Sequence, residues 1–171
     1  MIRGVDVRIS DLAVIRRPEL IEIGDHVCID MGCYISTGAK IGDYIHISPY
    51  VCITGGEDAH LIMEDFSGIS AGSKLIVISD DFTKGLTNPT VPVKYRYLVG
   101  GKIIMRKFSV IGANSVVLPG VEMAEGSALG ANSLLTKDTQ PWTVYSGSPA
   151  KVCGWRDKKM IMKASKEMGY E

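Results

Sequence analysis

A hydrophobic residue recurs at every sixth position over much of this chain, and no other feature of the sequence constrains the fold as strongly. The groups of six open at Ile23, Ile29, Ile35, Ile41, Ile47, Met63, Ile69, Leu75, Met105, Ile111, Val117, Met123, Leu129 and Leu135. The register is lost around residues 55–58 and again between about 79 and 104. So many groups in one register indicate a structural repeat.

A period of six fits neither an amphipathic helix, with a period of about 3.6, nor a half-buried strand, with a period of about 2. It suits a triangular coil of three short strands, with about 18 residues per turn. The first residue of each group is predicted to point inward, together with a small or aliphatic residue four positions later. Examples of this fifth position are Val27, Ile45, Ser115 and Ser133. The glycines in second position are expected to supply backbone freedom where the chain turns a corner.

The composition supports a β fold. Ile (19) and Val (15) outnumber Leu (10), and Gly accounts for 19 of 171 residues, as expected for strands and turns. The 19 Lys and Arg balance the 19 Asp and Glu, which argues against nucleic-acid binding through excess positive charge. No apolar run approaches the roughly 18 residues of a membrane span, and the first ten residues lack the apolar stretch of a signal peptide. We therefore expect a cytoplasmic protein without a membrane span.

We expect one domain over residues 1–171. Its predicted parts are an imperfect first coil (1–22), regular coils (23–78), a loop (79–104), further coils (105–140) and a C-terminal extension (141–171). A loop of that length inside a compact domain is usually functional. The spacing of Trp155, Met160, Ile161 and Met162 in the extension predicts a short helix that covers the last coil.

Several strings resemble the hexapeptide-repeat acyltransferases. Residues 110–121 (VIGANSVVLPGV), 126–138 (GSALGANSLLTKD) and 146–151 (SGSPAK) are similar to the galactoside, maltose and serine acetyltransferases. Residues 79–82 and 86–92 resemble acetyltransferases of bacterial surface polysaccharides. The resemblance covers roughly residues 5–155. It implies a left-handed parallel β-helix, acetyl-CoA as the acyl donor, and a homotrimer with sites between subunits.

Acyl transfer requires a proton acceptor that works near neutral pH, and histidine suits this role. Of the three histidines, His46 is the best candidate because it ends its group of six at a corner and should point outward. His60 follows the irregular residues 55–58 and is a candidate for binding the acceptor. His26 is expected to lie on the surface.

The resemblance also implies a catalytic histidine at the entry to the long loop, where this chain has Asp80 and Asp81 instead. We predict that one of these aspartates takes part, for example by orienting His46 across a subunit interface. The alternative is that both only hold the loop through local hydrogen bonds. Within the loop, Asn88, Tyr95 and Arg96 are candidate contacts for the acceptor.

For the donor, the resemblance implies that coenzyme A lies along the C-terminal coils. The matching positions for coenzyme A are Ala113, Ala131, Thr136 and Lys137, where small residues and open backbone allow close approach of the pantetheine arm. Lys137, Lys151 and Arg156 are cations that could neutralise its phosphates. Lysines of this kind are also common on a solvated face.

The four cysteines, Cys28, Cys33, Cys52 and Cys153, form no CxxC pair, and disulfides are not expected. Cys33 occupies an inward fifth position and should be a small core residue. No metal site is predicted.

Four functions remain open. The first is O-acetylation of a sugar hydroxyl, in the synthesis of a bacterial surface polysaccharide such as O-antigen or capsule. The second is N-acetylation of a nucleotide-linked amino-deoxysugar, which the missing loop histidine favours because an amine needs less help from a base. A zinc hydratase would need three converging imidazoles, and the spacing of the histidines disfavours it. A non-catalytic structural subunit is disfavoured by the complete donor strings.

Overall fold

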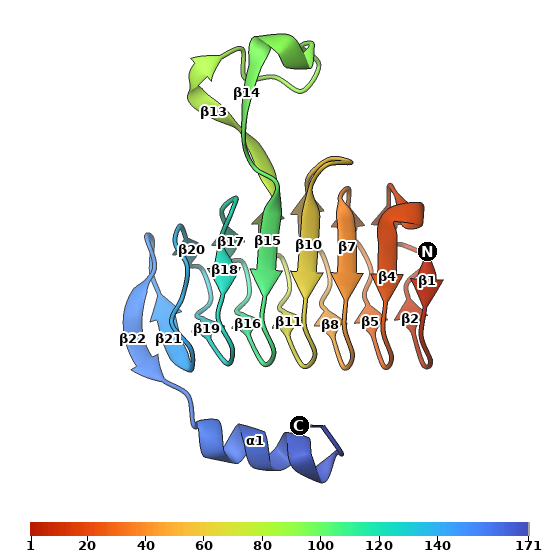
Figure 1. Cartoon of the computed structure of the whole chain (residues 1–171), viewed down its shortest axis with the longest axis vertical. Helices are drawn as coiled ribbons and strands as arrows, with labels where there is room; N and C mark the ends of the chain where they lie inside the picture. Colours follow the sequence, from red (N-terminus) through yellow and green to blue (C-terminus); the bar gives the residue numbers. More distant parts are fainter. Residues whose placement is uncertain (171) are drawn as a thin grey trace.

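Three parallel sheets form the faces of a triangular solenoid (Figure 1). The computed structural model describes residues 1–170. Sheet A contains β1 (Ile2–Arg3), β4 (Ile21–Ile23), β7 (Gly38–Ile41), β10 (His60–Met63), β15 (Lys102–Met105) and β18 (Glu122–Met123). Sheet B contains β2 (Arg8–Ile9), β5 (Cys28–Ile29), β8 (His46–Ile47), β11 (Gly68–Ile69), β16 (Val110–Ile111), β19 (Ala128–Leu129), β21 (Thr143–Ser146) and β22 (Lys151–Trp155). Sheet C contains β3 (Val14–Ile15), β6 (Tyr34–Ile35), β9 (Cys52–Thr54), β12 (Lys74–Ile76), β17 (Val116–Val117) and β20 (Leu134–Leu135).

The chain passes through sheets A, B and C in turn, so each coil has three edges. We name them the A–B edge (residues 24–27, 42–45, 64–67, 106–109 and 124–127), the B–C edge (30–33, 48–51, 70–73, 112–115 and 130–133) and the C–A edge (16–20, 36–37, 55–59, 77–101 and 118–121). Neighbouring coils pair with an offset of 18 residues, as in Cys28 with His46. Between β7 and β10 the offset is 22, because residues 55–58 lengthen that coil.

The core consists of the residues that the period points inward. Ile29, Ile35 and Ile47 are at most 1% exposed, and the fifth-position residues Ile45 and Ser115 are buried as well. Cys33 is buried among them. The predicted all-β coil and its inward positions are therefore confirmed.

Glycine is required in second position for a different physical reason from the one expected. Gly24, Gly42, Gly112 and Gly130 do not adopt a positive φ. A Cβ added at Gly112 would instead lie 2.6 Å from the backbone nitrogen of Ala131 in the next coil. Glycine is needed there because stacked coils approach each other closely, while turns such as the one at Gly72 (φ +72°) use its backbone freedom.

The long insertion is a β-hairpin that projects from the C–A edge (Figure 1). It consists of β13 (Ile78–Gly85), the 3-10 helix η2 (Val93–Tyr95) and β14 (Arg96–Gly100), with β13 and β14 antiparallel. A second 3-10 helix, η1 (Pro18–Leu20), lies on the same edge. Regular coiling resumes at Lys102, where β15 pairs with β10, three residues before the predicted position.

The C-terminal helix forms but does not cover the last coil. The exposed edge of β21 is paired instead by β22, which runs antiparallel to it and includes Trp155. Asp157 is the N-cap of helix α1 (Lys158–Glu167), and its side chain accepts a hydrogen bond from the Met160 amide. The strand satisfies the open backbone groups of β21, so the helix is free to pack elsewhere.

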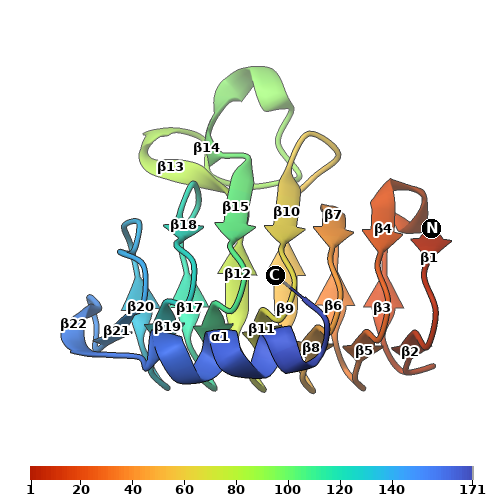
Figure 2. The same ribbon diagram turned by 60° about the horizontal axis from the view of Figure 1, so that its bottom comes forward.

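Helix α1 runs along the side of the solenoid (Figure 2), over aromatic rings of the A–B edge. There His26, Tyr44, Phe66 and Phe108 stack in sequence, with centroids 4.6–5.3 Å apart. Tyr170, just after α1, meets Tyr44 and Phe66 edge-on. The edge-on contacts of Tyr170 with Tyr44 and Phe66 hold the end of the helix against rings from two coils. No helix within residues 1–170 is long and apolar enough to cross a membrane.

Candidate functional site

His46 lies at the start of β8 and points outward from sheet B, with 57% of its side chain exposed. Its Nε2 is 2.6 Å from Oδ2 of Asp30, at the end of the preceding coil's strand. Its Nδ1 is 3.5 Å from the hydroxyl of Ser48. The histidine therefore has an acidic partner within its own chain, and this partner is neither Asp80 nor Asp81.

The thiol of Cys28 completes a small polar cluster at this place. Cys28 is the register partner of His46, and its Sγ is 3.5 Å from Oδ1 of Asp30. The hydrogen bond with His46 lowers the pKa of Asp30, which keeps the carboxylate ionised. Burial raises the pKa of the Cys28 thiol, and Asp30 raises it further. Among residues 1–170, these three side chains form a group of potential metal ligands whose donor atoms lie within 4.8 Å of one another.

Sequence reasoning missed Asp30, although a signal was available. A coil of 18 residues places position 28 beside position 46 on the same face, and residue 30 follows at the adjacent edge. An acidic residue two positions after the register partner of a histidine can reach its ring.

Asp80 lies at the base of the hairpin and forms a bidentate ion pair with Arg96. The two distances are 2.7 Å to Nε and 2.8 Å to Nη2, and both side chains are largely shielded. Hydrogen bonds from Arg96 lower the pKa of Asp80. Arg96 is a predicted contact for the acceptor, and Asp80 is a predicted catalytic residue. Within this chain the two side chains pair with each other.

Asp81 is held by local contacts. Its Oδ1 accepts hydrogen bonds from the backbone amide and hydroxyl of Thr83, and its Oδ2 lies 3.4 Å from Nζ of Lys84. The bonds from Thr83 lower the pKa of Asp81. This arrangement matches the predicted alternative in which the aspartate holds the loop.

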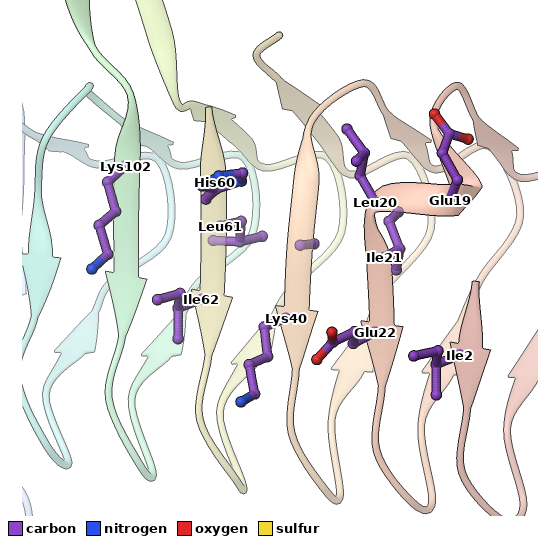
Figure 3. Close-up of a pocket in the computed structure, with 11 residues that line it drawn as sticks. Ile2, Glu19, Leu20, Ile21, Glu22, Lys40, His60, Leu61, Ile62 and Lys102 are labelled. Atoms are coloured by element: carbon purple, nitrogen blue, oxygen red, sulfur yellow. The ribbon is translucent and has the colours of Figure 1, made fainter. Parts of the chain in front are cut away.

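The remaining predicted acceptor contacts are divided between the hairpin and sheet A. Asn88 and Tyr95 are exposed near the hairpin tip, where the Asn88 side chain accepts from the amide and hydroxyl of Thr90. His60 begins β10 at the hairpin root, and its amide donates to Gly101 at 2.8 Å. Its ring lies over Gly38 and lines an open groove of about 510 Å³ on sheet A, with Lys40, Ile62 and Lys102 nearby (Figure 3).

Sheet B is the face opposite the C–A edge, so His46 and the hairpin lie on different sides of one chain (Figure 1). Within a single chain, Asp80 therefore does not meet His46.

The predicted donor residues lie on all three edges. Ala113 and Ala131 occupy equivalent positions on the B–C edge, and Lys151 begins β22 beside this edge. Thr136 and Lys137 are exposed after β20, toward the C–A edge.

Arg156 lies on the A–B edge, at the other end of β22 from Lys151. Its Nη1 donates to the carbonyl oxygens of Phe108, at 2.5 Å, and Gly126, at 3.1 Å. Burial lowers its pKa. The guanidinium thus joins two coils of the solenoid and does not group with the other predicted donor residues.

Comparison with known proteins identifies the family. No family model matches the sequence. The chain is 37% identical over 163 residues to a dTDP-4-amino-4,6-dideoxy-D-glucose acyltransferase of Escherichia coli, which covers 92% of this chain and 83% of the relative. It is 35% identical to AntD, an N-acyltransferase from Bacillus cereus solved with dTDP and 3-hydroxybutyryl-CoA, with a TM-score of 0.92 over 97% of this chain and 88% of AntD.

A hexapeptide-repeat acetyltransferase of Vibrio cholerae shares only 20% identity, with a TM-score of 0.59 over 91% of this chain and 73% of the other, and supports the fold alone. The predicted family, the repeat fold and the enzyme class are confirmed. The chain belongs to the hexapeptide-repeat acyltransferases.

Proposed function

We propose that this protein is an N-acyltransferase that moves an acyl group from a coenzyme A thioester to the amino group of a nucleotide-linked amino-dideoxysugar. The observation that carries the proposal is the likeness to the Escherichia coli acyltransferase over most of both chains. AntD was also solved with dTDP-4-amino-4,6-dideoxyglucose and coenzyme A. These relatives favour the amino-sugar acceptor, which the sequence analysis gave second, over the hydroxyl acceptor that it gave first.

In this reaction the sugar ammonium first loses a proton, and its nitrogen then attacks the thioester carbonyl carbon. A C–N bond forms, the C–S bond breaks, and the second nitrogen-bound proton leaves as the coenzyme A thiol is released. The protein must hold a carboxylate or imidazole near the amine and a hydrogen-bond donor near the carbonyl oxygen.

Asp80 is our candidate for the proton acceptor. The AntD structures include variants at one aspartate and at a serine ten positions before it. Two pairs in this chain have that spacing, Ser48 with Asp58 and Ser70 with Asp80. Only the second places the aspartate in the hairpin, and its Arg96 partner favours the ionised form that a proton acceptor needs. Ser70, on the B–C edge, would then donate to the carbonyl oxygen. Asp81 is assigned to holding the hairpin turn.

His46 is the second candidate, because its exposed ring is oriented by Asp30 on sheet B, one coil from Gly68 and Ser70. In this arrangement one chain supplies His46 from sheet B and Ser70 from the adjoining B–C edge, and the hairpin of another chain supplies Asp80. The small Ala113 and Ala131 on the same edge leave room for the pantetheine arm, and Lys151 can neutralise a phosphate.

We propose a homotrimer on the same grounds. The hairpin exposes a group of large hydrophobic side chains, namely Phe82, Leu86, Val93, Tyr95, Tyr97, Leu98 and Val99. Apolar groups of this size that gather on a projecting element usually mark an interface. A neighbouring chain that covers them would also bring Asp80 to a second B–C edge.

The acceptor assignment is tested by following thiol release from acetyl-CoA and 3-hydroxybutyryl-CoA. The acceptors are dTDP-4-amino-4,6-dideoxyglucose and the same nucleotide sugar with a hydroxyl at the amino position. We expect turnover with the amine alone and a product with an amide. Faster turnover with the hydroxyl compound would overturn the N-acyltransferase assignment.

The proton acceptor is tested by Asp80→Asn and His46→Gln. The variant that lacks the side chain accepting the proton should lower kcat by about 10²- to 10⁴-fold, and we expect this loss for Asp80→Asn. His26→Gln is the matched control for His46→Gln, because His26 also pairs with an aspartate, Asp6 at 3.2 Å, on a different edge. Normal kcat for Asp80→Asn in an intact trimer would exclude Asp80; if His46→Gln also lost activity, the role would pass to His46.

A further inference from the structure

The Cys28, Asp30 and His46 side chains combine three kinds of metal ligand on the outer surface of sheet B. The solenoid itself brings them together, since Cys28 and His46 are paired across neighbouring coils and Asp30 follows Cys28 by two residues. Their thiol sulfur, carboxylate oxygen and imidazole nitrogen atoms all lie within 4.8 Å of one another. We propose that this cluster is a binding site for Zn²⁺ or a similar borderline divalent cation.

The distances between the donor atoms suit tetrahedral zinc. With Zn–S near 2.3 Å and Zn–O and Zn–N near 2.0 Å, the edges of the tetrahedron are about 3.5 Å for S···O and about 3.3 Å for N···O. The Cys28 Sγ to Asp30 Oδ1 distance is 3.5 Å, which matches. The oxygen that faces His46 is the other one, Oδ2, at 2.6 Å from Nε2, which is too short for the N···O edge. Metal binding therefore requires the Asp30 carboxylate to turn so that one oxygen serves both edges. A small rotation of the Asp30 side chain, one-third exposed, can supply this movement.

The ligand chemistry selects the class of metal. A thiolate with an imidazole favours zinc and its neighbours, whereas magnesium and calcium require mostly oxygen ligands. A thiolate and a carboxylate together balance the charge of a divalent ion. Arg8, the register partner of Cys28 on the other side, is the neighbouring cation, and its guanidinium is directed toward Asp6 at 3.9 Å.

The residues around the cluster leave it accessible to a metal ion and help to orient the His46 ring. His46 is exposed, and the next coil has Gly68 at the paired position, so no side chain there covers the ring. The Ser48 hydroxyl lies 3.5 Å from Nδ1 of His46, where an oxygen acceptor commonly fixes the ring of a metal-bound histidine. Three protein ligands would leave the fourth position to water.

The proposed metal site does not depend on which sugar is acylated or on catalysis, and its test measures metal binding. The full-length protein is stripped with a chelator and titrated with Co²⁺, whose visible spectrum reports tetrahedral geometry and whose near-ultraviolet band reports a thiolate ligand. We expect about one Co²⁺ per chain with both signals, and loss of both on addition of Zn²⁺.

Variants separate this site from adventitious binding. Cys28→Ser should abolish the thiolate band and weaken Zn²⁺ binding at least tenfold, whereas Cys52→Ser, at a half-buried thiol of sheet C, should leave both unchanged. His46→Gln should weaken binding similarly, and His26→Gln should not. An octahedral Co²⁺ spectrum, or the same spectrum in Cys28→Ser, would overturn the proposal. Either result would leave the acyltransferase assignment untouched.

Discussion

At the scale of single residues, serine occupies the inward fifth position in several groups of six, with two different outcomes. Ser115 is fully buried, donates to the Gly130 carbonyl at 2.8 Å and accepts from the Ser133 amide at 3.2 Å. Ser109 is equally buried in the same coil, but its hydroxyl has no hydrogen-bond partner among the described residues. The repeat selects a small inward residue at both positions, while only one hydroxyl is used.

These two serines give a matched pair for measuring stability. Ser115→Ala should lower the free energy of unfolding by about 1–2 kcal/mol, because it leaves a buried carbonyl and amide without their hydroxyl partner. Ser109→Ala should leave stability unchanged or raise it by about 0.5–1 kcal/mol, since it removes only an unpaired polar atom. Urea unfolding of both variants measures the difference. An equal loss in both would show that the Ser109 hydroxyl is paired in solution.

At the scale of elements, the ion pair between Asp80 and Arg96 fastens the two strands of the hairpin to each other. Asp80 lies near the base of β13, opposite Leu98, and Arg96 begins β14 at the end farther from the C–A edge. The pair holds Asp80 in place, as its proposed role of proton acceptor for a neighbouring chain requires.

This ion pair predicts a pH dependence of the hairpin. Arg96 lowers the pKa of Asp80, so the stabilisation is fully present above the unfolded pKa of about 4 and is lost as the pH falls through the lowered value. The hydrogen-exchange protection factors of residues 78–100, which are corrected for the intrinsic effect of pH on amide exchange, should therefore fall at low pH in the natural protein. In Arg96→Gln exchange should already be faster at pH 7 and show less of this change. Equal protection of both proteins at pH 7 would contradict a fastening role.

The sequence predicts helix α1 but does not predict the surface against which the helix packs. The spacing of apolar residues after Trp155 indicates a helix, and one forms from Lys158. Its partners are rings on the A–B edge that come from separate coils. Nothing local to residues 155–170 specifies them.

At the scale of the whole molecule, strands β5 and β8, which carry Cys28 and His46, belong to sheet B, and the hairpin of β13 and β14 projects from the opposite edge (Figure 1). The groups proposed for catalysis therefore lie apart within one chain, and in the proposed trimer a second chain brings them together.

The trimer prediction follows from the hydrophobic surface of the hairpin. Replacing Phe82 and Tyr97, which are 81% and 59% exposed, with serine should convert the trimer to monomer and remove activity while the coil remains folded. Light scattering and circular dichroism measure the two effects. Trp155→Ser is the matched control, because Trp155 is also 81% exposed but lies on β22. A stable trimer in the double variant would exclude the hairpin as the interface.

The sequence by itself determined the coil, its inward residues and the position of the insertion, because a period of six is a local property and fixes which residues of each group must be buried. The family was indicated separately, by the resemblance of residues 110–121, 126–138 and 146–151 to known acyltransferases. Tertiary structure alone decided which outward residues meet. Contacts between coils decide the pairing of His46 with Asp30 and the close approach that requires Gly112. They also decide the position of Arg156 on the A–B edge and the surface against which α1 packs. Those contacts are set by how the coils stack, including the extra residues at 55–58, and no single group of six contains that information.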